Sequence, residues 1–224
     1  MYALSLKLLS LLILIPVVAQ APVPVGEEPR HHVKFQNKYV RVIDAAVPVG
    51  DATLFHTHAL DNIPVAISGG RLKTEVMGGG EARESTVATG TVTWAPGSYS
   101  HRISNIGDTP LRFIDAEILA SPGSVPNAPA LDKTPGHTLV LENERVRIYR
   151  VVLDPGQSTG VHTHVLPGLT VAVSRGQLWR DVAGRKSQTM LVNAGEFQWH
   201  GGPRRYSIRN IGTERFESVD IEWK

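Results

Sequence analysis

The chain has 224 residues, a formal net charge of +2 and no cysteine. The absence of cysteine excludes disulfide bonds, thiolate metal sites and cysteine nucleophiles. The net charge is too small, and the lysines and arginines are too scattered, to indicate a protein that binds nucleic acid.

The chain begins with a segment typical of a signal peptide. Residues 1–7 carry a single lysine, and residues 8–18 form an apolar run that is too short to span a bilayer. Val17 and Ala19 are the small residues expected at the −3 and −1 positions of a signal-peptidase site. We therefore predict that residues 1–19 are removed and that the mature protein is periplasmic or secreted, without a stable membrane span. An uncleaved membrane anchor is the alternative.

The rest of the chain consists of two copies of one unit. Residues 31–50, 64–72 and 102–118 align with residues 137–156, 170–178 and 207–223. A repeat of this length indicates a duplicated domain, because the units of a solenoid are shorter and more numerous. Residues 120–136, between the two copies, are rich in proline and small residues, which is typical of a linker. The predicted organisation is an N-terminal linker over 20–29, a first domain over 30–119, a second linker over 120–136 and a second domain over 137–224.

Both units predict short β-strands. The stretches "YVRVIDAAV" (39–47) and "RVRIYRVVL" (145–153) have a period near two, and glycine, proline and asparagine separate the apolar stretches. No stretch combines a cap with the 3.6-residue period of a helix. All-β units of about ninety residues suit a sandwich or a jelly-roll barrel.

Two histidines in the first unit predict a metal site. His56 and His58 lie two residues apart in a predicted strand, so their side chains project from the same face, and apolar neighbours indicate that this face points inward. Buried imidazoles without partners are costly, and a divalent ion satisfies both at once. In "GTVTWAPGSYSHRISN" (90–105), His101 enters a further strand after a proline turn. The alternative is a polar cluster held by hydrogen bonds.

These residues resemble the two sequence motifs of the cupins. Gly50, His56, His58 and Gly70 fit the first motif, and Gly90, Pro96, His101 and Asn105 fit the second, with Ser98 in place of its inner glycine. In the second copy Gly156, His162, His164 and Gly176 fit the first motif, and only Gly195 and Asn210 fit the second. The resemblance covers nearly the whole mature chain. It implies two tandem cupin-like jelly-roll β-barrels (double-stranded β-helices), a bicupin.

The first copy departs from the cupin pattern at the metal-binding glutamate. That position falls on Ile63 and Leu169 when the repeat is aligned without gaps, and on Asn62 and Gly168 with the shorter spacing. The resemblance then implies a three-histidine site without glutamate, as in the thiol dioxygenases and some diketone-cleaving dioxygenases. Fe(II) is the favoured ion, and Mn, Ni, Cu or Zn also suit such ligands. Asp61 is a weak candidate for a catalytic group or for an acceptor of a ligand N–H, and a polar turn residue is the simpler interpretation.

The second copy has Tyr206 where the second motif has a histidine. His162 and His164 remain, and His200 occupies the position of Ala95 rather than that of His101. We predict a weaker second site from His162, His164, Tyr206 and His200. A relic pair held by hydrogen bonds or water is the alternative.

Other repeated or charged residues have simpler interpretations. His31 and His137 recur at the outer ends of the two units, and we interpret them as edge or capping residues. Trp94 and Trp199 are equivalent and are expected to fill the barrels. The arginine pair at 204–205 could hold an anionic substrate, but a solvated turn is the better interpretation.

These patterns favour an exported, metal-dependent oxidoreductase of the dioxygenase type that acts on a small organic molecule. The alternatives are a non-catalytic periplasmic protein that binds a metal ion or a small molecule, and a purely structural barrel pair. The expected partner is a small-molecule substrate or ligand and not a nucleic acid. Duplicated barrels can pack on each other within one chain, so both a monomer and a homodimer fit the sequence.

Overall fold

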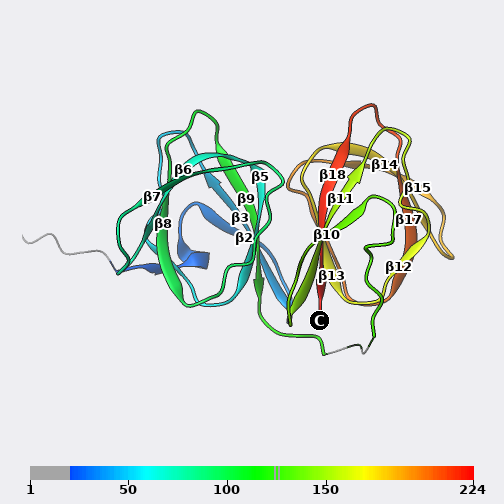
Figure 1. The fold of residues 1–224 in the computed structure, drawn as a ribbon, viewed down its shortest axis with the longest axis horizontal. Coiled ribbons are helices and arrows are strands. Elements are labelled where there is room, and N and C mark those ends of the chain that lie inside the picture. The colour runs from blue at the N-terminus through cyan, green and yellow to red at the C-terminus, as the bar shows by residue number, and fades with distance from the viewer. Residues whose placement is uncertain (1–20, 124, 126) are drawn as a thin grey trace, which may run out of the picture.

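The computed structural model describes residues 21–123, 125 and 127–224, so the predicted signal peptide lies outside the described residues. The chain forms two β-barrels side by side (Figure 1), here called barrel 1 (residues 23–118) and barrel 2 (residues 137–223). Barrel 1 contains β1 (Val23–Pro24), the 3-10 turn η1 (Val25–Glu27), β2 (His31–Gln36), β3 (Val40–Val47), β4 (His56–His58), β5 (Asn62–Ser68), β6 (Gly70–Val76), β7 (Arg83–Val87), β8 (Tyr99–Asn105) and β9 (Leu111–Ile118). Barrel 2 contains β10 (His137–Glu142), β11 (Val146–Leu153), β12 (His162–His164), β13 (Gly168–Ala172), β14 (Gly176–Val182), β15 (Gln188–Val192), β16 (Phe197–His200), β17 (Arg204–Asn210) and β18 (Phe216–Trp223).

Each barrel is a pair of sheets. Barrel 1 combines the orders β2-β3-β9-β5 and β1-β4-β8-β6-β7, and barrel 2 combines β10-β11-β18-β13-β16 and β12-β17-β14-β15. The prediction of two tandem all-β jelly-roll units is confirmed. In the part of the chain that the structure describes, no helix is long and apolar enough to cross a membrane.

Alternation along the inner strands decides what each barrel encloses. On β9, Ile114 and Ile118 join the apolar core that lies between the barrels, whereas Phe113 and Asp115 line the interior of barrel 1. Successive side chains of a strand point to opposite faces, so one strand supplies both surfaces. The equivalent strand β18 does the same in barrel 2, where Asp220 points into the cavity. The repeated Asp-x-Glu of the two units is therefore internal to the barrels.

The largest apolar core lies between the barrels rather than within them. It is built from β3, β5 and β9 of barrel 1 and from β11, β13 and β18 of barrel 2, which face each other in Figure 1. Trp94 and Trp199 pack against this core, which differs from the expectation that they fill the barrel interiors. The Trp199 ring stacks on Tyr39 of barrel 1 with a centroid separation of 6.1 Å. The two units therefore form one packed body.

Two segments that the sequence predicts as linkers take part in the fold. Val23 and Pro24 pair in parallel with β4, and Val25 and Glu28 are buried, so much of the predicted N-terminal linker belongs to barrel 1. The backbone groups at the edge of β4 can pair with any extended segment, so this pairing requires no hydrophobic pattern in residues 23–24 that the sequence analysis could have detected. In the second linker, Leu131 is buried and its backbone N–H donates to the Tyr149 hydroxyl at 3.1 Å.

Candidate metal centres

Each barrel encloses a cavity with a His-Thr-His strand beside it. In both β4 and β12 the two histidines are buried and the threonine between them is half-buried, as the strand period requires. The cavity of barrel 1 measures about 280 Å³ and that of barrel 2 about 220 Å³. The same local sequence thus places two imidazoles inside each barrel.

Strand register brings the third predicted histidine of barrel 1 to this pair. β8 runs antiparallel to β4, with His101 opposite His56 and Tyr99 opposite His58. The His101 ring centroid lies 4.5 Å from that of His56 and 5.2 Å from that of His58. The three imidazoles are neighbours, and the coordination of an ion by His101 stays a prediction.

A fourth histidine, His31, joins the cluster from the start of β2. One ligand nitrogen each from His31, His56 and His58 lies within 4.8 Å of the others. The His31 Nδ1 lies 2.5 Å from the Oε2 of Glu28, a buried carboxylate that also accepts the Arg30 backbone N–H at 2.8 Å. A carboxylate on one ring nitrogen orients the imidazole and leaves the other nitrogen for an ion.

His31 does begin an edge strand, but it is only 7% exposed and lies in the histidine cluster, which its interpretation as an edge or capping residue did not predict. The recurrence of this histidine as His137 was the available signal. The contact of His31 with His56 could not be predicted from their spacing in the sequence, because β2 and β4 belong to different sheets of barrel 1.

Burial keeps the imidazoles of barrel 1 neutral. Burial, together with the smaller effect of the neighbouring imidazoles, lowers the pKa of His56 to about 4, that of His101 to about 3 and that of His58 to about 2. Neutral imidazole is the form that binds metal ions.

Unpartnered nitrogen atoms show that these residues fit a metal ion. The Nδ1 of His56 lies 3.0 Å from the carbonyl oxygen of Leu54, to which it donates, so its Nε2 carries the lone pair. That Nε2, the Nδ1 of His58 and the Nε2 of His101 are all buried without a hydrogen-bond partner among the described residues. Buried nitrogens without partners are unusual in a folded protein, and a divalent ion among His31, His56 and His58, whose ligand atoms lie within 4.8 Å of one another, suits this arrangement.

The carboxyl groups of barrel 1 differ from the cupin pattern. Of the two candidate positions for the usual glutamate, Ile63 lies in the core between the barrels and Asn62 lines the cavity, where its Nδ2 donates to the Tyr99 hydroxyl at 3.2 Å. Asp61 accepts the Gly97 backbone N–H at 2.9 Å and pairs with Arg145 of barrel 2 at 2.6 Å, so both of its oxygens are engaged outside the histidine cluster. The carboxyl that lines the cavity is Asp115, which the sequence reasoning missed.

Asp115 is a buried acid close to neutrality. Burial, followed by the nearby Glu117 charge, raises its pKa to about 7, and its Oδ1 has no hydrogen-bond partner among the described residues. Glu117 itself is paired with Arg41. A group of this kind can hold or release a proton near neutral pH.

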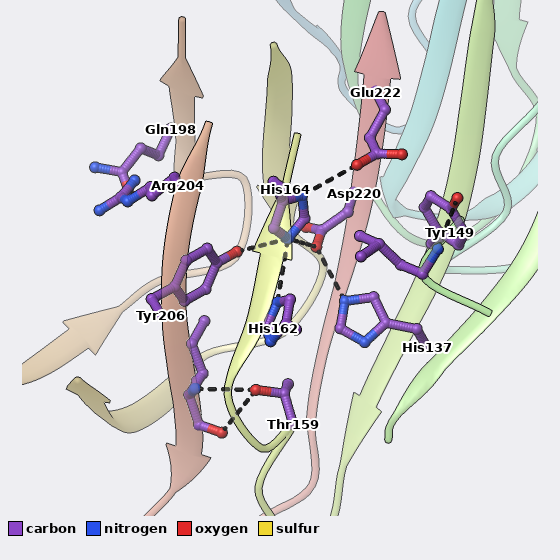
Figure 2. Close-up of polar contacts among 12 residues, drawn as sticks. His137, Tyr149, Thr159, His162, His164, Gln198, Arg204, Tyr206, Asp220 and Glu222 are labelled. Carbon is purple, nitrogen blue, oxygen red and sulfur yellow. Dashed lines mark hydrogen bonds and ion pairs between the residues drawn. The ribbon is translucent and has the colours of Figure 1, made fainter. Parts of the chain in front are cut away.

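Barrel 2 builds its cluster from different partners (Figure 2). One nitrogen each from His137, His162 and His164 lies within 4.8 Å of the others. The Nε2 atoms of His162 and His164 are 3.2 Å apart, and the Tyr206 hydroxyl lies 2.9 Å from the same atom of His164. The donors that surround this nitrogen compete with an ion for it.

A carboxylate also belongs to the cluster of barrel 2. The Oδ2 of Asp220 lies 3.5 Å from the Nε2 of His137 and 3.8 Å from that of His164, as Figure 2 shows. Burial acts to raise the pKa of Asp220, but its contacts with His137 and the charge of His164 lower it to about 2. Glu222 approaches the other nitrogen of His164 at 3.5 Å.

His200 fits next to this cluster because the residue opposite it on the neighbouring strand is a glycine. Gly168 on β13 lies opposite His200 on β16, and a Cβ atom at Gly168 would lie 2.7 Å from the Nε2 of His200. The missing side chain leaves room for the imidazole, whose centroid lies 5.1 Å from that of His164. In barrel 1 the same register pairs Asn62 with Ala95, so the larger residue stands on the other strand. All four predicted residues of the second site are thus near one another, and their binding of an ion stays a prediction.

Comparisons with known proteins agree with this architecture. No protein-family profile matches the chain, and no curated sequence matches it. Among solved structures, AerE from Microcystis aeruginosa is similar with a TM-score of 0.65 and 15% identity, over 91% of this chain and 98% of that one. Salicylate 1,2-dioxygenase from Pseudaminobacter salicylatoxidans is similar with a TM-score of 0.59 and 14% identity, over 89% and 78%. A cupin 2 conserved barrel domain protein from Leptotrichia buccalis has a TM-score of 0.55 and 11% identity, over 93% of both chains.

At these identities the likeness concerns the fold. Together with the duplicated sheets and the histidine cluster in each barrel, it shows that the chain has the cupin fold twice in tandem.

Proposed function

We propose that barrel 1 binds a divalent metal ion and that the protein is a metal-dependent oxidoreductase of the dioxygenase type. The observation that carries this proposal is the cluster of His31, His56 and His58, whose ligand nitrogens lie within 4.8 Å of one another, beside a cavity of about 280 Å³ that His101 also lines. His56 and His58 would hold the ion, with His31 and His101 on either side of them. Imidazole ligands suit Fe(II), which we favour, and also Mn, Ni, Cu and Zn.

The residues around the cavity suit the oxidation of a small organic molecule. When bound, a redox-active ion would polarise the substrate and supply the electron transfer that an oxygenase needs. The side chains of Val47, Leu72 and Phe113 line the cavity and would exclude water from a bound substrate. Burial raises the pKa of Tyr99 to about 12, so this phenol remains a hydrogen-bond donor. Asp115, which lines the cavity, would take a proton from the substrate or return it.

Metal content and oxygen uptake test the proposal directly. Protein prepared without an affinity tag is loaded anaerobically with Fe(II), and its metal content is measured before substrates are added. The panel contains diketones, flavonoids, thiols and hydroxybenzoates, the last because solved structures of the salicylate dioxygenase hold gentisate. We expect one ion in barrel 1 and oxygen consumption with one class of substrate. Stoichiometric metal without uptake on any class would overturn the enzymatic part.

A non-catalytic binding protein is the second candidate, and the chemistry of barrel 2 favours it. There the Tyr206 hydroxyl and His162 already contact the nitrogen of His164 that an ion would need. The variant His101→Ala distinguishes the two candidates in barrel 1. A loss of bound metal together with turnover supports the enzyme, whereas a loss of metal in a protein that never shows turnover supports the binder.

Export of the protein is a further proposal that rests on the sequence alone. The apolar run at 8–18 and the small residues at 17 and 19 support a cleaved signal peptide. N-terminal sequencing of protein from a periplasmic extract is expected to begin at Gln20. A full-length chain in the membrane fraction would favour the anchor instead.

A further inference from the structure

Two arginines of barrel 2 converge on one neutral oxygen. Arg180 on β14 and Arg204 on β17 both line the cavity, and each donates from Nη1 to the Oε1 of Gln198, at 3.0 and 3.3 Å. Figure 2 shows Arg204 and Gln198 beside Tyr206, on the side away from His137. Strand alternation separates the arginine pair at 204–205, because Arg204 faces the cavity whereas Arg205 is exposed.

The charges of these two guanidinium groups are not balanced. Within residues 21–123, 125 and 127–224, no carboxylate lies within 4.0 Å of Arg180 or Arg204, whereas five other arginines that do have such a partner are Arg30, Arg41, Arg112, Arg145 and Arg150. The Nε of Arg180 is buried without an acceptor. Burial, and then the charge of Arg204, lowers the pKa of Arg180. The carboxylate of Glu196 also lines the cavity, but its Oε1 accepts from Asn193 at 2.7 Å.

One part of the cavity wall is apolar, whereas His137, His162, Tyr206 and Asp220 are among the polar residues that line another part. The apolar part is formed by Leu153, Ala172, Leu178, Met190, Val192, Ile208 and Phe216. Barrel 1 has a similar wall but no cation at the equivalent positions, since Thr74 pairs with Ile103 as Arg180 pairs with Ile208. Tyr99 likewise stands opposite His58, where Arg204 stands opposite His164. Cationic groups beside an apolar wall are therefore specific to barrel 2.

We propose that the cavity of barrel 2 binds a small organic carboxylate, held by Arg180 and Arg204 with its apolar body against Leu178 and Phe216. A carboxylate would replace the Gln198 oxygen between the guanidinium groups, which present planar forks of donors that match its geometry. The site is separate from the metal-dependent chemistry proposed for barrel 1.

Titration calorimetry with benzoate tests the site on protein treated with a chelator. Benzamide is the neutral probe of nearly the same shape, and inorganic phosphate is the anion without an apolar body. The variants are Arg180→Gln and Arg204→Gln. Arg205→Gln is the matched control, because Arg205 lies on the same strand as Arg204 but its side chain is exposed to solvent. Arg204→Lys keeps the charge and removes the fork. Circular dichroism establishes that each variant is folded.

We expect benzoate to bind the wild type and Arg205→Gln equally, and to bind each cavity variant at least about tenfold more weakly, because each loses a charge-assisted hydrogen bond. Arg204→Lys is expected to lie between them. Equal binding of benzamide, equal binding of phosphate, or unchanged affinity in both Gln variants would overturn the proposal. So would a requirement for added metal, because the carboxylate would then bind an ion rather than the arginines. None of these results depends on oxygen uptake by barrel 1.

Discussion

The two barrels share a backbone and a His-Thr-His strand but satisfy their imidazoles differently. In barrel 1 the nitrogens of His56, His58 and His101 are buried without partners. In barrel 2 one nitrogen each of His137, His164 and His200 is also buried without a hydrogen-bond partner among the described residues, but the Nε2 of His164 contacts the Tyr206 hydroxyl at 2.9 Å and lies 3.8 Å from the Asp220 carboxylate. The second copy has thus closed one ligand nitrogen, that of His164, with a hydrogen bond.

The difference shows how a duplicated site can diverge through few residues. The exchange of His101 for Tyr206 replaces a ligand with a hydroxyl donor, and the exchange of Thr74 for Arg180 adds a cation to the cavity wall. The strands that carry these residues keep the same register in both barrels. Function can therefore change while the apolar core between the barrels stays intact.

The largest expected effect comes from the histidine pair of barrel 1. The variants His56→Ala and His58→Ala should each abolish stoichiometric metal binding by barrel 1, because each removes a ligand from the centre of the cluster. Metal content and a chelator competition measure this. His32→Ala, an exposed histidine next to His31, is the control and should bind as the wild type does. Equal metal content in all three variants would show that the ion lies elsewhere.

The metal-free protein should lose stability in acid, because the pKa of His101 is lower in the folded protein than in the unfolded chain. The folded pKa of His101 is about 3, below the ordinary value of 6.5, so the unfolded chain binds the extra proton. The stabilisation is complete above pH 6.5 and is lost as the pH falls from 6.5 towards 3, with a slope of about 1.4 kcal/mol per pH unit for one histidine.

Urea denaturation at several pH values between 7.5 and 4.5 measures this slope. His101→Gln should lower this slope by about 1.4 kcal/mol per pH unit, the contribution of one proton. The raised pKa of Asp115 makes the protein less stable as the pH rises. This opposite contribution is the same in the wild type and in His101→Gln, so it cancels when the two are compared. An unchanged slope would show that His101 is protonated in the folded state.

Glu28 offers a way to test the role of His31 without touching a ligand. The variant Glu28→Gln removes the charge that orients the His31 ring from 2.5 Å. We expect a loss of metal affinity of about 10- to 100-fold, which is the usual effect of such orienting carboxylates. Glu27→Gln, an exposed neighbour, is the control. If Glu28→Gln binds metal normally while His101→Ala does not, His101 and not His31 completes the site.

Tyr206 offers the reverse test, which makes barrel 2 more like barrel 1. Tyr206→His restores the histidine of the second motif and should raise the metal affinity of barrel 2 by about tenfold, since an added ligand replaces a competing hydroxyl. Tyr206→Phe removes the hydroxyl alone and should cost about 1 kcal/mol of stability. Metal titrations are made in a His58→Ala background to silence barrel 1. No gain with Tyr206→His would show that Asp220 and not Tyr206 limits the site.

The smallest expected effect concerns the contact between the barrels. Arg145→Gln breaks the pair with Asp61, a partly exposed contact of 2.6 Å, and should cost at most about 1 kcal/mol in urea denaturation. The metal affinity of barrel 1 should not change, because Asp61 has no contact with the histidines. A change in metal affinity would return Asp61 to the list of candidate site residues.

The sequence by itself determined the features that depend on local spacing. The period of two predicted the strands, the internal alignment predicted the two units, and the His-x-His spacing placed His56 and His58 on one inward face. His101 was also within reach of the sequence, because the proline turn before it belongs to a recognisable motif.

The tertiary structure decided every feature that depends on strands far apart in the chain. His31 and Asp115 reach the cavity through the crossing of sheets, and the meeting of Arg180, Arg204 and Gln198 depends on the registers of β14, β16 and β17. The tryptophans at 94 and 199 lie between the barrels because the inner sheets carry apolar residues on their outer faces. A strand's alternation fixes two faces, but only the packing of one sheet against another decides which face meets which partner.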